Sequence, residues 1–140
     1  METLVTAAEM ADIDRKAQEQ GIPGMVLMEN AGQHAFRIWL ALQELTDSDP
    51  VGDGVTDGTD PEEIGLVVAV AGAGNNGGDA LVMARACSNL GIPVIAVLSK
   101  EELKGSAEEQ HGILKSMGMD LRYWDQPGAR DAIQQEIGRA

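Results

Sequence analysis

The sequence predicts an α/β fold with a parallel sheet, and three observations carry that prediction. Two continuous apolar runs rich in valine, 64–71 and 93–98, have the pattern of strands that are buried on both faces of a parallel sheet. Helical patterns precede, separate and follow them, which is the alternation typical of α/β proteins. The length of 140 residues suits one compact domain and is too short for two. We therefore expect a single domain over residues 1–140.

Two helices are expected before any strand. The first, over 6–20, opens with Thr6 and Glu9 at the spacing of a capping box, and its apolar residues recur at helical intervals. A Gly-Ile-Pro-Gly break at 21–24 separates it from a second helical pattern over 25–45. The first pattern predicts an amphipathic helix, and the second predicts a further helix.

An acidic, glycine-rich and proline-rich segment follows over 46–63. Its seven acidic residues cannot pack in a core, so we expect a solvated loop inserted at the surface. Asp47, Asp49 and Asp53 suggest a calcium site, but the register of an EF-hand loop is not met, and plain solvation is favoured.

The first strand, 64–71, ends at the glycine-rich segment 72–79, and a helical pattern over 80–90 leads to the second strand, 93–98. A further amphipathic helix is expected over 104–117. A short third strand over 121–124 and a helix-compatible tail over 128–140 complete the chain, with a cytoplasmic, soluble protein expected because no leader or membrane-length apolar run occurs in the sequence. About three strands are visible, fewer than the five or six of a usual sheet, so we expect the sheet of this chain to be incomplete.

The charge of the chain excludes two classes of partner. It carries 23 acidic and 10 basic residues, a net charge of -13, and only four of the basic residues are lysine. Nucleic acid and anionic membrane surfaces would repel such a chain. The same composition is typical of proteins from a high-salt cytoplasm, where counterions screen the self-repulsion. The single cysteine, Cys87, lies in an apolar helical pattern and is interpreted as a core residue.

The glycine-rich segment is the strongest candidate for a ligand site. Gly72, Gly74 and Gly77 match G-x-G-x-x-G between an expected strand and an expected helix, the context of a dinucleotide-binding loop. Asn75 and Asn76 add polar side chains, and Asp79 adds a carboxylate that would repel a pyrophosphate on the helix terminus. The loop therefore suits something other than a simple diphosphate.

Structural roles compete with that hypothesis. Asp79 could be the N-cap of the following helix, and Asn75 and Asn76 could occupy left-handed turn positions. Glu29 and Asn30 are either ligand contacts, a cap or a packing pair, with packing favoured.

Three further residues are weaker candidates. Lys100 follows the second strand, where it could contact a ribose or a phosphate, although solvation is favoured. His34 and His111 lie on separate expected helices without an acid at metal-pair spacing, so a core or surface role is favoured for both.

Two long segments identify a family resemblance. The segments 25–32 (MVLMENAG) and 71–85 (AGAGNNGGDALVMAR) strongly resemble the YjeF N-terminal domain, the NAD(P)HX epimerase family, and the likeness runs from Glu9 to Leu121. The resemblance implies a Rossmann-like three-layer αβα sandwich and an isomerase that interconverts the R and S hydrates of NADH and NADPH. It also implies a potassium ion, NADHX and NADPHX as substrates, a homodimer in the full-length protein and a fused or separate dehydratase.

Carried over to this sequence, the resemblance assigns hydrated-cofactor binding to Asn75, Asn76, Gly77, Gly78 and Asp79. It also makes Asn76 a potassium ligand.

The sequence departs from the family pattern in its last part. An Asp-x-x-Phe-Gly-Thr-Gly loop, whose aspartate is proposed for catalysis and for potassium binding, does not occur before Ala140, nor does the Asp-x-Pro-Ser-Gly stretch that follows it. We therefore expect an N-terminal portion of the family domain, as a fragment or a truncated product, that does not epimerise on its own. The alternative is a non-catalytic binding or scaffold module, because relatives of this domain occur as an apolipoprotein-binding protein and in an mRNA-decapping scaffold.

Overall fold

The computed structural model describes residues 4–47 and 64–138 and has the α/β architecture that the sequence predicts. The acidic segment lies outside the described residues over 48–63, so the solvated loop expected there stays a prediction, as does the preference for solvation over a calcium site. The elements in chain order are α1 (Ala7–Glu19), α2 (Gly24–Asp47), β1 (Val67–Ala71), α3 (Asn75–Asn89), β2 (Val94–Leu98), α4 (Ser106–Ser116), β3 (Leu121–Tyr123) and α5 (Ala129–Ile137).

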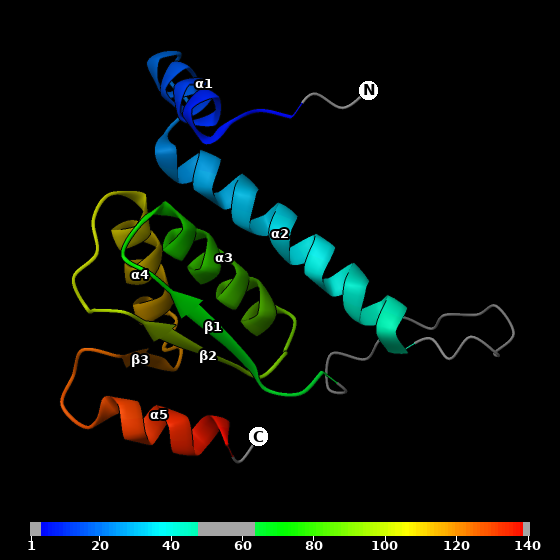
Figure 1. Ribbon diagram of the computed structural model, residues 1–140, viewed down its shortest axis with the longest axis vertical. Helices are drawn as coiled ribbons and strands as arrows, with labels where there is room; N and C mark the ends of the chain where they lie inside the picture. Colours follow the sequence, from blue (N-terminus) through cyan, green and yellow to red (C-terminus); the bar gives the residue numbers. More distant parts are fainter. Residues whose placement is uncertain (1–3, 48–63, 139–140) are drawn as a thin grey trace, which may run out of the picture.

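The three strands form one parallel sheet in the order β1-β2-β3 (Figure 1). Ala71 pairs with Leu98, and Leu98 pairs with Tyr123, so the carboxyl ends of all three strands lie side by side. Segments that follow the strands therefore meet at the carboxyl end of the sheet, which is where open α/β sheets bind ligands.

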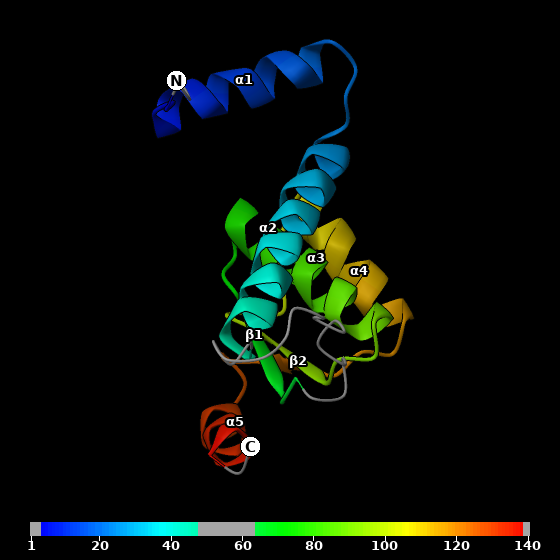
Figure 2. The same cartoon turned by 90° about the vertical axis from the view of Figure 1, so that its right-hand side faces the viewer.

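Alternate residues of the strands build two cores on the two faces of the sheet. Ala71, Ala96 and Leu98 face a core shared with α2, α3 and α4, whereas Ile95 and Val97 pack against Ile133 of α5. Figures 1 and 2 show α5 on the face opposite α3 and α4, so the layers are helices, sheet and helix.

Helices α2 and α3 run side by side in the same direction (Figure 1). A Cβ added at Gly32 would lie 2.5 Å from Cβ of Val82, and one added at Gly78 would lie 2.3 Å from Sδ of Met28. Further along, Phe36 shares a core cluster with Ala86. Residues fifty positions apart therefore face each other along the whole contact, and two of the contacts leave no room for a side chain on one partner.

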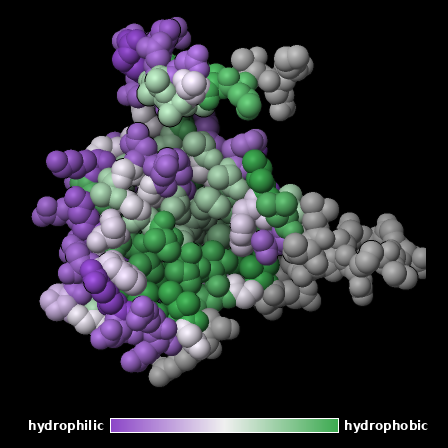
Figure 3. All heavy atoms as spheres, viewed as in Figure 1, coloured by the Kyte–Doolittle hydropathy of each residue, from purple (hydrophilic) through white to green (hydrophobic). Residues whose placement is uncertain are grey.

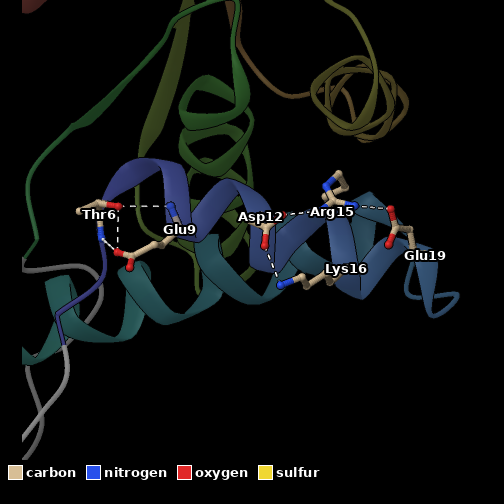
Figure 4. A network of polar contacts seen from close by, with 6 residues as sticks. All are labelled: Thr6, Glu9, Asp12, Arg15, Lys16 and Glu19. Carbon is tan, nitrogen blue, oxygen red and sulfur yellow. Dashed lines mark hydrogen bonds and ion pairs between the residues drawn. The ribbon is translucent and has the colours of Figure 1, made fainter.

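Helix α1 stands apart from this core. None of its residues is buried, and Figure 2 shows it separated from the sheet layers. Its predicted capping box is present, because the Thr6 hydroxyl accepts a hydrogen bond from the amide of Glu9 and the Glu9 carboxylate accepts one from the amide of Thr6. The charged face of the helix carries ion pairs of Arg15 and Lys16 (Figure 4).

Strand β1 differs from its prediction in length and in burial. It begins at Val67, three residues later than expected, and Val70 is 71% exposed, so burial on both faces is wrong for β1. The reason is position, because β1 is one of the two edge strands of the described sheet and α5 packs mainly against β2 and β3. Figure 3 shows an apolar area on this face of the molecule, over the region of β1.

Other boundaries shift by a few residues. Helix α2 extends to Asp47, so Thr46 and Asp47 are helical and do not begin the loop.

Cys87 is 2% exposed and belongs to the core, as predicted, and burial raises the pKa of its thiol to about 11. Within the described ranges, no helix is long and apolar enough to cross a membrane.

Candidate functional site

The glycine-rich segment joins the carboxyl end of β1 to the first turn of α3. Together with Val70 it lines an open depression of about 370 Å³, whose other lining residues are Gly72, Gly74, Asn75, Asn76 and Gly77. The predicted site residues 75–77 are thus brought to the sheet edge at which the strand ends meet, while Gly78 and Asp79 lie one step deeper along α3.

Gly77 and Gly78 are closely packed, Gly77 against backbone and Gly78 against a flexible side chain. A Cβ at Gly77 would lie 1.9 Å from the carbonyl oxygen of Gly72, and one at Gly78 would lie 2.3 Å from Sδ of Met28. The amides of both residues donate to the carbonyl of Gly74, at 3.0 and 3.3 Å. These two glycines fold the segment back onto itself and start the helix, whereas Gly72 and Gly74 have open space at the same position.

Helix α3 begins at Asn75, five residues earlier than predicted, because Gly77 and Gly78 adopt helical geometry here. Gly74 is the N-cap and provides no side-chain hydrogen bond. Asp79 as the N-cap is therefore wrong, and left-handed positions for Asn75 and Asn76 are also wrong, since no described residue other than glycine has a positive φ. Both asparagines are exposed in the first helical turn, where backbone amides attract anionic groups.

Asp79 is a half-buried acid of α3 that faces a second acid from α1. Burial raises the pKa of Asp79, and the charge of Asp14 raises it further. Asp14 and Asn75 line a second depression of about 500 Å³ between α1 and the start of α3. Acidic, basic and amide side chains therefore line this depression where α1 passes the glycine-rich segment, since Arg15, Gln18 and Glu19 also border it.

Sequence reasoning missed Asp14. Of the four acids of α1, Glu9, Asp12 and Glu19 have partners within that helix or its cap (Figure 4), while Asp14 makes no hydrogen bond or ion pair with any described residue. The available signal was its position, since Asp14 interrupts the apolar stripe formed by Met10, Ile13 and Ala17.

Glu29 is a packing residue, as favoured from the sequence, whereas Asn30 is exposed and is not part of a buried pair. The carboxylate of Glu29 binds the guanidinium of Arg85 on α3 and accepts a hydrogen bond from Gln110 on α4 at 3.1 Å. Partial burial by itself raises the pKa of Glu29, but the hydrogen bonds from Arg85, Gln33 and Gln110 outweigh it and hold that pKa below its ordinary value.

The remaining candidates lie apart from the depression at Asn75. His34 is exposed, and His111 is a buried residue whose Nε2 lies 2.9 Å from the hydroxyl of Tyr123. Burial and the charge of Lys115 lower the pKa of His111. Within the described ranges, no three His, Cys, Asp or Glu side chains gather at a metal-binding distance.

Lys100 lies in a different cavity, of about 780 Å³, beyond the carboxyl ends of β2 and β3. Lys104 and Lys115 also line it, but so do Glu101, Glu102, Glu108 and Asp125. Because acids outnumber the lysines, this cavity does not favour an anionic ligand.

Comparison with known proteins gives one family model and several relatives. The model of the YjeF-related protein N-terminus matches residues 24–135. The chain is 36% identical over 121 residues to the bifunctional NAD(P)H-hydrate repair enzyme Nnr of Moorella thermoacetica, a match that covers 84% of this chain and 20% of that enzyme. It is 32% identical over 121 residues to the NAD(P)H-hydrate epimerase of Rhodopirellula baltica, which covers 84% of this chain and 42% of the relative.

A solved structure shares the fold. The crystal structure of the yeast protein ynu0, YNL200c, superposes with a TM-score of 0.61 at 25% sequence identity, over 91% of this chain and 49% of that one. The chain therefore spans between 20% and 49% of the length of these three proteins.

Proposed function

The chain belongs to the family of the YjeF-related protein N-terminus, and from that premise we propose that it binds the hydrated forms of NADH and NADPH as part of an NAD(P)H-hydrate epimerase. The family resemblance indicated by segments 25–32 and 71–85 is thereby confirmed. The Rossmann-like α/β fold is confirmed as well. The activity, the substrates and the partners are our proposal, because the chain spans less than half of these relatives.

The observation that carries the proposal is the construction of the turn from β1 into α3. Gly77 leaves no space for a side chain against the backbone of Gly72, and Gly78 packs against the end of the Met28 side chain. This tight turn holds Asn75 and Asn76 exposed at the carboxyl end of a parallel sheet. Such a turn presents backbone amides and side-chain amides to a ligand on one side. Relatives matched over the same residues carry names that specify NAD(P)H-hydrate repair or epimerisation.

In this site we assign the ligand contacts to Asn75, Asn76, Gly77, Gly78 and Asp79. The backbone amides of Asn75 and Asn76, at the start of α3, would bind the phosphates, and the asparagine side chains would bind hydroxyl or carboxamide groups. The half-buried carboxylate of Asp79 would accept hydrogen bonds from hydroxyl groups of the ligand.

We also propose that Asn76 binds a potassium ion. Amide and carbonyl oxygens are hard neutral ligands that suit an alkali cation, and the exposed side chain of Asn76 lies in the depression beside the Gly72 backbone. The positive end of the α3 dipole disfavours a cation there, so Asn76 can hold the ion only together with the charge of a bound ligand. A cation supplies charge that offsets the repulsion between Asp79 and the ligand's phosphates.

Homodimer formation and a cytoplasmic location stay predictions. A second repair activity, on the same chain or on a partner, is proposed from the relatives named bifunctional.

Binding and isomerisation of resolved isomers test the proposal. The R and S forms of NADHX and NADPHX are titrated into the chain by calorimetry in KCl, with NADH and NADPH as unhydrated controls, and the isomer ratio is followed by chromatography. We expect binding of the hydrates that exceeds binding of the unhydrated cofactors. Equal affinity for NADH and NADHX, or no binding of either, contradicts the proposal.

A further inference from the structure

Glu29 on α2 holds three helices together around the start of α3. Its carboxylate binds Arg85 of α3 and accepts hydrogen bonds from Gln110 of α4 and from Gln33 of α2, each at 3.1 Å. An oxygen shared by donors from two other helices fixes the distance between those helices and its own. Arg85 lies 56 residues from Glu29, and Gln110 lies 81 residues from it.

The donors around Glu29 are buried. Gln110 is fully buried, and the side chain of Arg85 is 18% exposed. Nε of Arg85 and Oε1 of Gln110 have no hydrogen-bond partner in the part of the chain that the structure describes. Arg85 pairs with Glu29, whereas Nε2 of Gln110 donates to Glu29 and also lies 3.4 Å from Sδ of Met25 on α2. Taking the charge from Glu29 therefore leaves a partly buried guanidinium without its anion.

The same three helices form the slot that seats Gly78. A Cβ added there would lie 2.3 Å from Sδ of Met28 on α2 and 3.3 Å from Cα of Ala107 on α4. Met28 precedes Glu29 in the chain, and Ala107 lies one helical turn before Gln110. The contacts of Glu29 thus connect the two walls of the slot.

We infer that Glu29, acting through Arg85 and Gln110, is a positioning residue that sets the width of this slot and so orients Asn75 and Asn76 at the start of α3. The inference rests on the proposed function for its link to ligand binding. Its structural part stands on the contacts alone, because Gly78 packs between the side chain of Met28 and the backbone of Ala107.

Two variants separate positioning from simple stabilisation. Glu29→Gln keeps the shape but removes the anion that Arg85 needs. Gln110→Met keeps the volume, breaks only the link to α4 and also removes the unpaired Oε1, so its unfolding free energy should stay equal or rise. If Glu29 and Gln110 only stabilise the fold, Gln110→Met should leave the start of α3 unchanged. If they position it, Gln110→Met should loosen the start of α3 even though the unfolding free energy does not fall.

The control is Phe36→Leu, which disturbs the same α2 and α3 contact at its far end, near Ala86 and away from the glycine-rich segment. For each protein, amide hydrogen exchange of residues 75–80 is measured without ligand, and the Kd for NADHX is measured by calorimetry. Both measurements are made at a temperature at which thermal melts show that the protein is folded.

We expect faster exchange at residues 75–80 in both variants. We also expect the Kd to rise on the order of tenfold for Glu29→Gln and about threefold for Gln110→Met. The control should change neither.

The inference is overturned if both variants keep the exchange rates of residues 75–80 and the Kd for NADHX within twofold of wild type. It is also overturned if the control Phe36→Leu shows changes as large as the two variants. If the wild type does not bind NADHX, the proposed function fails, and the exchange measurement alone still decides whether Glu29 positions the start of α3.

Discussion

Two glycines of one motif have opposite steric requirements. A Cβ at Gly77 would lie 1.9 Å from the Gly72 carbonyl oxygen, while one at Gly74, with φ of -98°, meets nothing within 4 Å. We expect Gly77→Ala to lower the free energy of unfolding by at least about 1–3 kcal/mol, because the turn must open to admit the methyl group. Gly74→Ala should change it by less than about 1 kcal/mol. Urea unfolding of both variants measures this difference, and equal losses would contradict the close contact at Gly77.

The two asparagines are expected to differ in their response to potassium. Asn76→Ala removes a side-chain oxygen and should weaken binding of the hydrated cofactor by on the order of 1–3 kcal/mol. Asn75→Gln keeps an amide at the neighbouring position and should weaken it less.

The ion is tested separately from the side chains. Wild type and both variants are titrated with NADHX in KCl and in the chloride of a large organic cation. The loss in Asn76→Ala should be largest in KCl and should shrink when potassium is absent. If wild-type affinity is the same in both salts, potassium has no part in the site.

Asp79 makes stability depend on pH with a definite sign. Burial and the charge of Asp14 raise its pKa in the folded state, so the folded protein binds that proton more tightly than the unfolded chain. Ionisation of Asp79 therefore lowers the free energy of unfolding. This cost is absent when the pH lies below 3.8, the ordinary pKa of aspartate, and is complete when the pH lies above the raised pKa of the folded state.

Asp79→Asn removes this cost. We expect its free energy of unfolding to exceed that of wild type at neutral pH and to approach it near about pH 3. Asp14→Asn should give a smaller gain in the same direction, because it removes only the second cause of the shift. Urea unfolding across this pH range measures both, and a wild-type advantage at neutral pH would show that the Asp79 carboxylate makes a favourable contact.

At the scale of elements, α1 combines a complete cap with an absence of buried residues. Thr6→Ala should destabilise this helix by about 1 kcal/mol. Because α1 contributes nothing to the described core, we expect this loss to appear as faster amide exchange in α1 alone, with an unchanged thermal midpoint for the sheet and α3. Thr6→Ser, which keeps the hydroxyl, is the control. A lower midpoint in Thr6→Ala would mean that α1 unfolds together with the core.

Local signals predicted most of the elements, and long-range contacts account for what they missed. The capping box at Thr6 and the apolar runs need only neighbours in sequence. The capping box is present, and β1 and β2 end at Ala71 and Leu98 as expected, although β1 begins three residues late. The start of α3 was placed too late, because two adjacent glycines normally disfavour a helix and only the tight contact of Gly77 with Gly72 explains one here.

The candidate site could be predicted only in part, because some of its residues come from segments that are far apart in the sequence. Asn75 to Asp79 form one motif, so sequence brought them together. Asp14 comes from a different helix, and the partners of Glu29 lie 56 and 81 residues away, at distances in sequence where no periodic pattern indicates a contact. Lys100 follows β2 as predicted, but the acids around it could be recognised only in three dimensions.

At the scale of the whole molecule, the net charge opposes self-association, whereas the unpaired edge of strand β1 favours it. A charge of -13 keeps copies of the chain apart, and salt screens that repulsion. Strand β1 pairs with β2 alone among the described strands, and its hydrogen bonds from Val67 to Pro93 and from Ser99 to Ala71 direct the backbone groups of Val68 and Val70 away from β2. An edge of this kind accepts another strand.

We therefore expect the chain to self-associate through β1, and to do so more strongly in multimolar KCl than in dilute buffer. Val70→Lys places a charge on the exposed apolar residue of that edge and should abolish the association. The substitution changes the net charge only from -13 to -12, which weakens the mutual repulsion, so a loss of association cannot come from added repulsion. Val5→Lys makes the same charge change at an exposed valine outside the sheet and should leave association intact. Sedimentation velocity of the three proteins at low and high KCl measures the effect. A wild type that stays monomeric in both salts, or a Val70→Lys variant that associates as strongly as wild type, would show that the edge of β1 does not bind a second copy.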